Sequence, residues 1–199
     1  MQLSAGYDSL PGMNRPGQRF VSEGAAPARF TAAEFMRMAE LGAFADMKVE
    51  LDHGELVRMT PPMSDHGAVQ ARVIIALSAV AARGGFTVYG EVGINLGEDT
   101  IRACDAALVR GEVPAHRLLE AAEVELAVEV SASTLDVDLG EKLRDYAAAG
   151  IPLYWVVDTG ARVVHVMRSP QGKAYAAREV VRFGEPLELP GGAGTILLD

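Results

Sequence analysis

Residues 124–131 read Val124-Glu-Leu-Ala-Val-Glu-Val-Ser131, and this stretch decides the fold. Valine and leucine recur at every second position, which is the period of a β-strand and predicts one wholly apolar face. Glu129 falls on the opposite face, together with Glu125 and Ser131. The stretch therefore predicts a strand with a carboxylate on its second face.

Residues 101–109 form a second apolar stretch, in which Asp105 is the only charge after Arg102. Strands this apolar are usually covered on both faces, so a carboxylate there is costly unless it is paired, protonated or bound to a metal. If the two strands are neighbours, Asp105 and Glu129 point the same way and repel by roughly 1 to 4 kcal/mol at about 4 Å. A divalent cation that prefers oxygen ligands, Mg²⁺ or Mn²⁺, removes that repulsion. The alternative is that each carboxylate pairs with an arginine or lies in water at a strand end.

The flanking sequence predicts three helices and further strands. Thr31-Ala-Ala-Glu34 has the form of a capping box and predicts a helix that ends near Gly42. A second helix, capped by Ser64, runs to about Arg83 and is apolar almost all round, which predicts that it is well buried. The third helix runs from Asp138, which opens another capping-box pattern, to Ala149. The other predicted strands are Val49–Asp52, Glu55–Met59, Phe86–Glu91, Leu153–Val157, Val163–Arg168 and Lys173–Val181. The sum is an α/β (α+β) fold with a mixed central β-sheet flanked by helices.

Composition places the chain among single-domain proteins. It has 199 residues and 49% hydrophobic content, enough for one buried core. Residues 1–28 are rich in Gly, Pro, Ser and Ala and predict a flexible tail, which leaves residues 29–199 as the domain. We expect no membrane span and no signal peptide, and the single cysteine, Cys104, excludes an internal disulfide or a cysteine zinc site. These features favour a cytoplasmic protein.

Net charge limits the kind of partner. The chain carries a formal charge of −9, and its eighteen Lys and Arg residues form no basic run. Because neutralising phosphates supplies most non-specific affinity for nucleic acid, tight binding to duplex DNA is disfavoured. Weak binding that depends on a bound cation remains open.

Six short motifs occur in an order that resembles a known family. They are Glu50-Leu-Asp-His-Gly-Glu55, Ser64-Asp-His-Gly67, Arg102-Ala-Cys-Asp105, Val128-Glu-Val-Ser-Ala-Ser-Thr134, Asp138-Leu-Gly-Glu-Lys-Leu-Arg-Asp-Tyr146 and Gly150-Ile-Pro-Leu-Tyr-Trp-Val-Val-Asp158. Their order and spacing, from about Phe30 to the carboxyl end, resemble the Uma-type family of putative restriction endonucleases in the PD-(D/E)XK nuclease superfamily. The resemblance implies a restriction-endonuclease-like fold and Mg²⁺- or Mn²⁺-dependent cleavage of DNA, with a homodimer so that both strands are cut.

The resemblance also implies a site. Asp105 and Glu129 match the two acidic metal ligands of the family, and Glu50 matches the upstream acid that completes such sites. Ser131 stands where a lysine is usual, which implies that Lys142 on the following helix takes that role. The residue before the motif aspartate is Cys104 instead of the usual proline, a position that ligates nothing.

Three of these residues have other interpretations. Lys142 follows Asp138 by four residues, the spacing of an exposed helical ion pair. His66 either binds a substrate phosphate at a helix start or makes an ordinary first-turn hydrogen bond. Ser131 is expected to support Glu129, because no Gly-x-Ser-x-Gly turn and no histidine partner favour a serine-hydrolase role for it. For the whole chain, the alternatives to a DNA endonuclease are a non-catalytic binding module and a phosphodiesterase acting on RNA or small nucleotides.

Overall fold

The computed structural model describes residues 26–199, so most of the predicted tail lies outside the described residues. The helical segments are α1 (Ala32–Glu40), α2 (Ser64–Ala81), η1 (Ala82–Gly84), η2 (Ala121–Glu123), α3 (Leu135–Val137), η3 (Asp138–Lys142), α4 (Leu143–Ala148) and η4 (Pro190–Gly192). The strands are β1 (Val49–Asp52), β2 (Glu55–Arg58), β3 (Phe86–Asn95), β4 (Ile101–Arg110), β5 (Leu119–Glu120), β6 (Val124–Ser131), β7 (Leu153–Asp158), β8 (Val163–Gln171), β9 (Ala174–Arg182), β10 (Leu187–Glu188) and β11 (Thr195–Ile196).

One mixed sheet organises the chain. Its strand order is β2-β1-β4-β6-β7-β8-β9, and β3 pairs with β4 and β5. The pair β6–β7 is parallel because the segment α3–η3–α4 crosses over between them, whereas the neighbouring pairs β4–β6 and β7–β8 are antiparallel. The predicted mixed sheet flanked by helices is confirmed.

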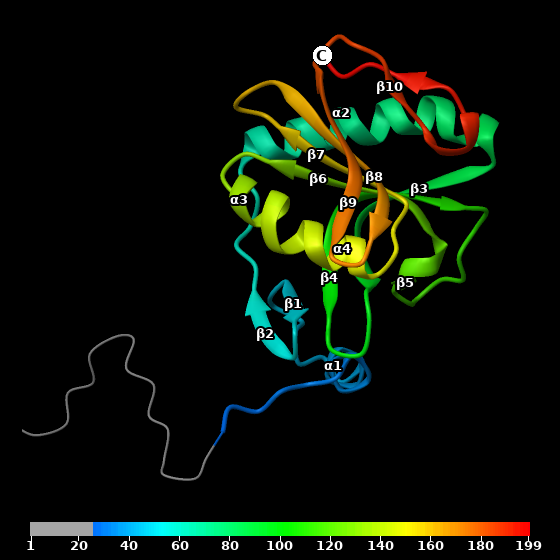
Figure 1. Cartoon of the computed structure of the whole chain (residues 1–199). Helices are drawn as coiled ribbons and strands as arrows, with labels where there is room; N and C mark the ends of the chain where they lie inside the picture. The colour runs from blue at the N-terminus through cyan, green and yellow to red at the C-terminus, as the bar shows by residue number, and fades with distance from the viewer. Residues whose placement is uncertain (1–25) are drawn as a thin grey trace, which may run out of the picture.

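Two helical layers cover the sheet (Figure 1). The helix α2 lies across one face, where Val69, Val73 and Leu77 pack with Leu126 and Val128 of β6. The other face is covered by η3 and α4. There, the buried cluster includes Leu143, Tyr146, Ala127, Tyr154 and Val156. The apolar face of β6 that meets α2 follows from its period-two pattern.

Some local predictions need correction. Val124 packs with the α4-side cluster and not with Leu126, because a register shift between Leu108 and Val109 interrupts the alternation. Met63 caps α2, and Ser64 is already its first helical residue. The third helical run begins at Leu135, so Asp138 lies inside it and does not open a capping box.

The predicted burial of α2 is wrong for its outer face. Ile75 is 69% exposed, because the sheet covers only one side of the helix. By length and composition Ser64–Gly84 passes as a possible membrane span, a test that core helices of this length also pass. The apolar side of α2 packs against the sheet, as the apolar side of a core helix does.

Candidate functional site

The sheet splits along one edge of β4. On its other edge β3 pairs with β4 from Phe86 to Asn95. On the split edge β1 pairs only at Ile101, and β6 pairs only from Ala106 onward. Residues 102–105 of β4 therefore face a gap between β1 and β6. A gap of this kind leaves backbone amides that need other acceptors.

Two predicted site carboxylates fill that gap. Oε1 of Glu50 accepts a hydrogen bond from the Ala103 amide at 2.8 Å. Oδ2 of Asp105 accepts one from the Val130 amide at 2.7 Å. Each carboxylate thus replaces a missing strand-to-strand hydrogen bond, and Asp105 is tied to the residue that follows Glu129.

Glu129 lies buried at the centre of the α4 side, with only 3% of its surface exposed. Its Oε1 accepts a hydrogen bond from the hydroxyl of Tyr146 at 2.7 Å and forms an ion pair with the ammonium of Lys142 at 3.0 Å. Burial raises the pKa of Glu129 to about 8; the Lys142 charge opposes this rise, while the charges of Asp105 and Asp138 add to it. The predicted pair Asp105 and Glu129 is therefore close enough to interact electrostatically.

Lys142 ends the π-helical turn η3 and reaches into the split. Besides Glu129, its Nζ lies 3.8 Å from Asp138 and 3.9 Å from Glu50. Burial favours the neutral amine, but these three carboxylates outweigh it and raise the pKa of Lys142 above its ordinary value. The four-residue pairing with Asp138 exists, yet both side chains are buried and not on a solvated face. A π-helical turn at this point is typical of functional positions.

Asp105 also faces α2. The imidazole Nε2 of His66, in the first turn of α2, lies 3.2 Å from Oδ2 of Asp105. Gln70, one turn further along, donates to the backbone carbonyl of Asp105 at 3.0 Å. The structure thus brings His66 to the predicted metal ligand. Among the described residues, the side chain of Ser131 makes no hydrogen bond to Glu129. Its hydroxyl lies 3.5 Å from the hydroxyl of Thr134.

Tyr146 and Asp138 belong to the site but were not predicted for it. Tyr146 stands four residues after Lys142, which places both on one face of a helix. That spacing is a usable signal, because a tyrosine in a buried stripe needs a partner for its hydroxyl. Asp138 was assigned to a helix start, and its contact with Lys142 depends on the earlier beginning of the helix at Leu135.

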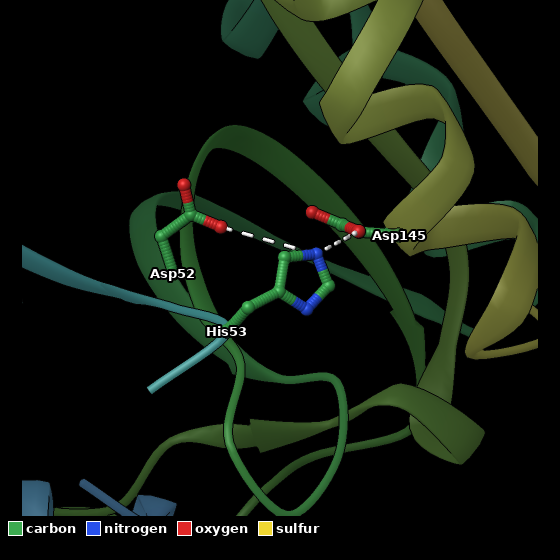
Figure 2. Close-up of side chains that lie close together, drawn as sticks. All are labelled: Asp52, His53 and Asp145. Atoms are coloured by element: carbon green, nitrogen blue, oxygen red, sulfur yellow. Dashed lines mark ion pairs between the residues drawn. The ribbon is translucent and has the colours of Figure 1, made fainter. Parts of the chain in front are cut away.

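A separate network surrounds Arg102. Among residues 26–199, the one group of three or more side chains with candidate metal-ligand atoms within 4.8 Å of one another is Asp52, His53 and Asp145 (Figure 2). Arg102 Nη2 lies 2.7 Å from Oδ1 of Asp52 and 2.7 Å from Oδ2 of Asp145. The guanidinium already supplies the positive charge that a metal would bring, so this group is an ion-pair network.

Arg102 also bears on the predicted ligands. Its Nη1 lies 3.3 Å from Oε2 of Glu50, so this carboxylate does pair with an arginine. Burial acts to lower the pKa of Arg102, but its bonds to Asp145 and the charges of Glu50 and Asp52 outweigh burial and raise it. The three predicted acids, Glu50, Asp105 and Glu129, come from three adjacent strands. Glu50 and Glu129 lie near Lys142, and the three acids do not converge as tightly as Asp52, His53 and Asp145.

Comparisons with known proteins agree with this architecture. The family model Uma2, described as "Putative restriction endonuclease", matches residues 32–197. A crystal structure of a "putative nuclease" from Anabaena variabilis has a TM-score of 0.63 at 19% identity, covering 82% of this chain and 91% of that one. At this identity the likeness shows the fold alone. No curated protein matched the sequence.

Proposed function

The chain belongs to the Uma2 family of putative restriction endonucleases, and from this membership we propose that residues 29–199 form a metal-dependent endonuclease domain that hydrolyses DNA phosphodiester bonds. The single observation that carries the proposal is the buried ammonium of Lys142, 3.0 Å from Glu129 in the split of the sheet. Phosphoryl transfer is catalysed by a fixed positive charge, and by acids that hold a metal ion, near the reacting phosphate.

The acids of the split fit a divalent cation. Both side-chain hydrogen bonds of Asp105 involve Oδ2, and the hydrogen bond and the nearest ion pair of Glu129 both involve Oε1. One oxygen of each carboxylate therefore has no hydrogen bond from any residue in the described range. Hard oxygen donors of this kind suit Mg²⁺ or Mn²⁺. When bound there, the cation would polarise the scissile phosphate and lower the pKa of the attacking water.

Glu50 has a supporting place in this proposal. Its Oε1 accepts from the Ala103 amide and its Oε2 from Arg102. With both oxygens engaged, Glu50 adds negative charge beside the cation and helps to hold Lys142. The ligands that we assign to the cation are Asp105 and Glu129, with Glu50 at its margin.

The remaining side chains orient the reacting groups. Lys142 stays protonated and places its ammonium where negative charge develops on the phosphate. Tyr146 holds the carboxylate of Glu129 through its hydroxyl, at 2.7 Å. His66 steadies Asp105 from the α2 side and lies at a helix start, where a phosphate oxygen is favoured. Ser131 is left without a direct part in this arrangement.

The proposal extends to substrate, location and assembly. The net charge of −9 supports weak, cation-dependent contact with DNA. A homodimer in the cytoplasm would place two such sites on the two strands of a duplex. The non-catalytic module and the phosphodiesterase for RNA or small nucleotides remain as alternative outcomes of the test.

The test is nicking of supercoiled plasmid by purified protein with Mn²⁺. We expect relaxed circles with the wild type and none with Glu129→Gln, which keeps the shape of the side chain. Glu125→Gln is the matched control, because Glu125 lies on the same strand and pairs with Arg110 outside the site. Cleavage of RNA alone would identify the second enzyme alternative, and an intact plasmid together with DNA binding would identify the binding module.

A further inference from the structure

A cavity of about 590 Å³ opens where the β1–β2 hairpin continues into α2. The segment that lines it runs from β2 to α2, in cyan in Figure 1. The wall is apolar apart from a few charges, which are set among methionines and prolines. Its main members are Met47, Met59, Pro61, Pro62, Lys48 and Arg58. Ligand cavities in proteins have volumes of about this size and similar apolar linings.

One ion pair links the cavity wall to the strand next to the proposed site. Nζ of Lys48, on the cavity wall, lies 2.6 Å from Oε2 of Glu91 on β3. On β3, Glu91 stands between Gly90 and Val92, which pair with Ala106 and Cys104 of β4. Glu91 is therefore level with Asp105 on the neighbouring strand. Glu91 has φ of 47°, so β3 is distorted at this point. The Lys48–Glu91 ion pair therefore links the cavity wall to the position on β3 that lies beside Asp105.

The charges of the cavity leave one cation without a partner. Glu91 neutralises Lys48, and this contact lowers the pKa of Glu91. Arg58 is exposed and makes no ion pair with any residue from 26 to 199. Asp46 is the one acid on the wall. A guanidinium binds phosphate oxygens, and a carboxylate accepts hydrogen bonds from the amino groups of nucleobases.

We propose that this cavity is a substrate subsite that takes one unpaired nucleotide of single-stranded DNA, next to the phosphodiester held at Asp105. The inference rests on the proposed nuclease function. The base lies against the methionine and proline wall, and its phosphate meets Arg58. A base in a duplex does not offer its face to such a wall. With a net charge of −9, the protein gains little affinity from phosphate contacts alone, which are what a duplex offers. Burial of an unpaired base adds affinity that does not depend on net charge.

Binding without cleavage tests this subsite. Fluorescence anisotropy in EDTA measures the affinity of the whole chain for a labelled twelve-nucleotide oligo(dC). The comparison probes are the same sequence as a duplex and an abasic strand of equal length. We expect the single strand to bind at least about tenfold more tightly than either comparison probe, because only its bases reach the wall.

The variant Arg58→Gln tests the phosphate contact. We expect it to weaken oligo(dC) binding by about tenfold and to reduce the salt slope by about one. Arg83→Gln is the matched control, because Arg83 is also exposed but lies in η1, at the far end of α2. The melting temperatures of both variants should equal that of the wild type, since neither side chain is buried.

The outcomes separate this inference from the proposed function. Equal affinity for the abasic strand, tighter binding of the duplex, or unchanged binding by Arg58→Gln would each overturn the subsite, whatever the nicking assay shows. Selective single-strand binding by a chain that nicks no plasmid with Mn²⁺ would support the subsite and overturn the nuclease. Glu125→Gln should bind oligo(dC) as the wild type does, because Glu125 pairs with Arg110 outside both the cavity and the proposed site.

Discussion

The ammonium of Lys142 lies 3.0 Å from Oε1 of Glu129, although Lys142 belongs to the π-helical turn η3 and Glu129 to the central strand β6. In the proposed mechanism, this lysine supplies from a helix the positive charge that Ser131 on the strand cannot supply. Asp138 and Glu50 extend the same network to η3 and β1. The predictions below follow from this arrangement.

The first prediction concerns Lys142 itself. Lys142→Met keeps the aliphatic stem and removes the charge, so we expect nicking to fall by about 10²- to 10³-fold. The change also leaves buried acids without their partner, which should cost about 3–5 kcal/mol of stability without metal. Chemical unfolding and the plasmid assay measure the two effects. A near-normal rate in a folded variant would remove Lys142 from the mechanism.

The second prediction concerns the metal. Mg²⁺ or Mn²⁺ should raise the melting temperature, because a ligand that binds only the folded state stabilises it. Asp105→Asn should abolish that rise, since an amide is a poorer ligand than a carboxylate. Asp158→Asn, at the end of β7, serves as the control. Calorimetry that finds unchanged metal affinity in Asp105→Asn would contradict the assigned site.

The third prediction is a pH dependence. The pKa of Glu129 is raised from 4.5 to about 8, so the folded state keeps a proton that the unfolded chain loses. The contribution of Glu129 to stability is therefore complete below about pH 4.5 and is lost as pH rises toward 8. Because a ligand must be deprotonated, the metal-induced rise in melting temperature should grow from pH 6 to pH 8. Glu129→Gln should remove both trends, and a pH-independent metal effect in the wild type would count against the assignment.

The fourth prediction concerns Arg102. Arg102→Met leaves Glu50, Asp52 and Asp145 without their common cation, and we expect a loss of about 3–5 kcal/mol. Arg168→Met, which breaks an exposed pair with Glu179, should cost about 0–1 kcal/mol. Equilibrium unfolding in urea compares the two variants. Equal losses would show that the Arg102 network adds nothing beyond a surface pair.

The fifth prediction concerns duplex DNA. Without metal, binding should be weak and should fall steeply with salt, because the scattered cations supply only phosphate contacts. Titrations of a labelled duplex in EDTA at several salt concentrations measure both properties. Nanomolar binding that is insensitive to salt would contradict this view of the surface.

The local elements could be predicted from the sequence because their signals are local. Thr31 and Glu34 form the expected capping box. Gly54, with φ of 82°, lies in the turn that joins the two predicted strands β1 and β2. The strand Val124–Ser131 has the predicted bounds. Each of these features depends on a few neighbouring residues and on the periods of helix and strand.

Other features depended on contacts that no local pattern contains. Val124 shares the period-two face of Leu126 in sequence, yet in the structure it packs on the α4 side because the pairing of β6 with β4 shifts register there. Exposure of Ile75 depends on how far the sheet extends beneath α2. In both cases packing between distant segments overrides the local preference.

By itself, then, the sequence determined the mixed sheet, its helical layers and the residue types of the site, because period and composition are properties of short segments. Only the tertiary structure decided which charges meet. Glu50, Arg102, Glu129 and Lys142 are far apart along the chain, and the split of β4 between β1 and β6 brings them within a few ångströms. Charge interactions depend on that distance and on burial, and the folded chain alone sets both.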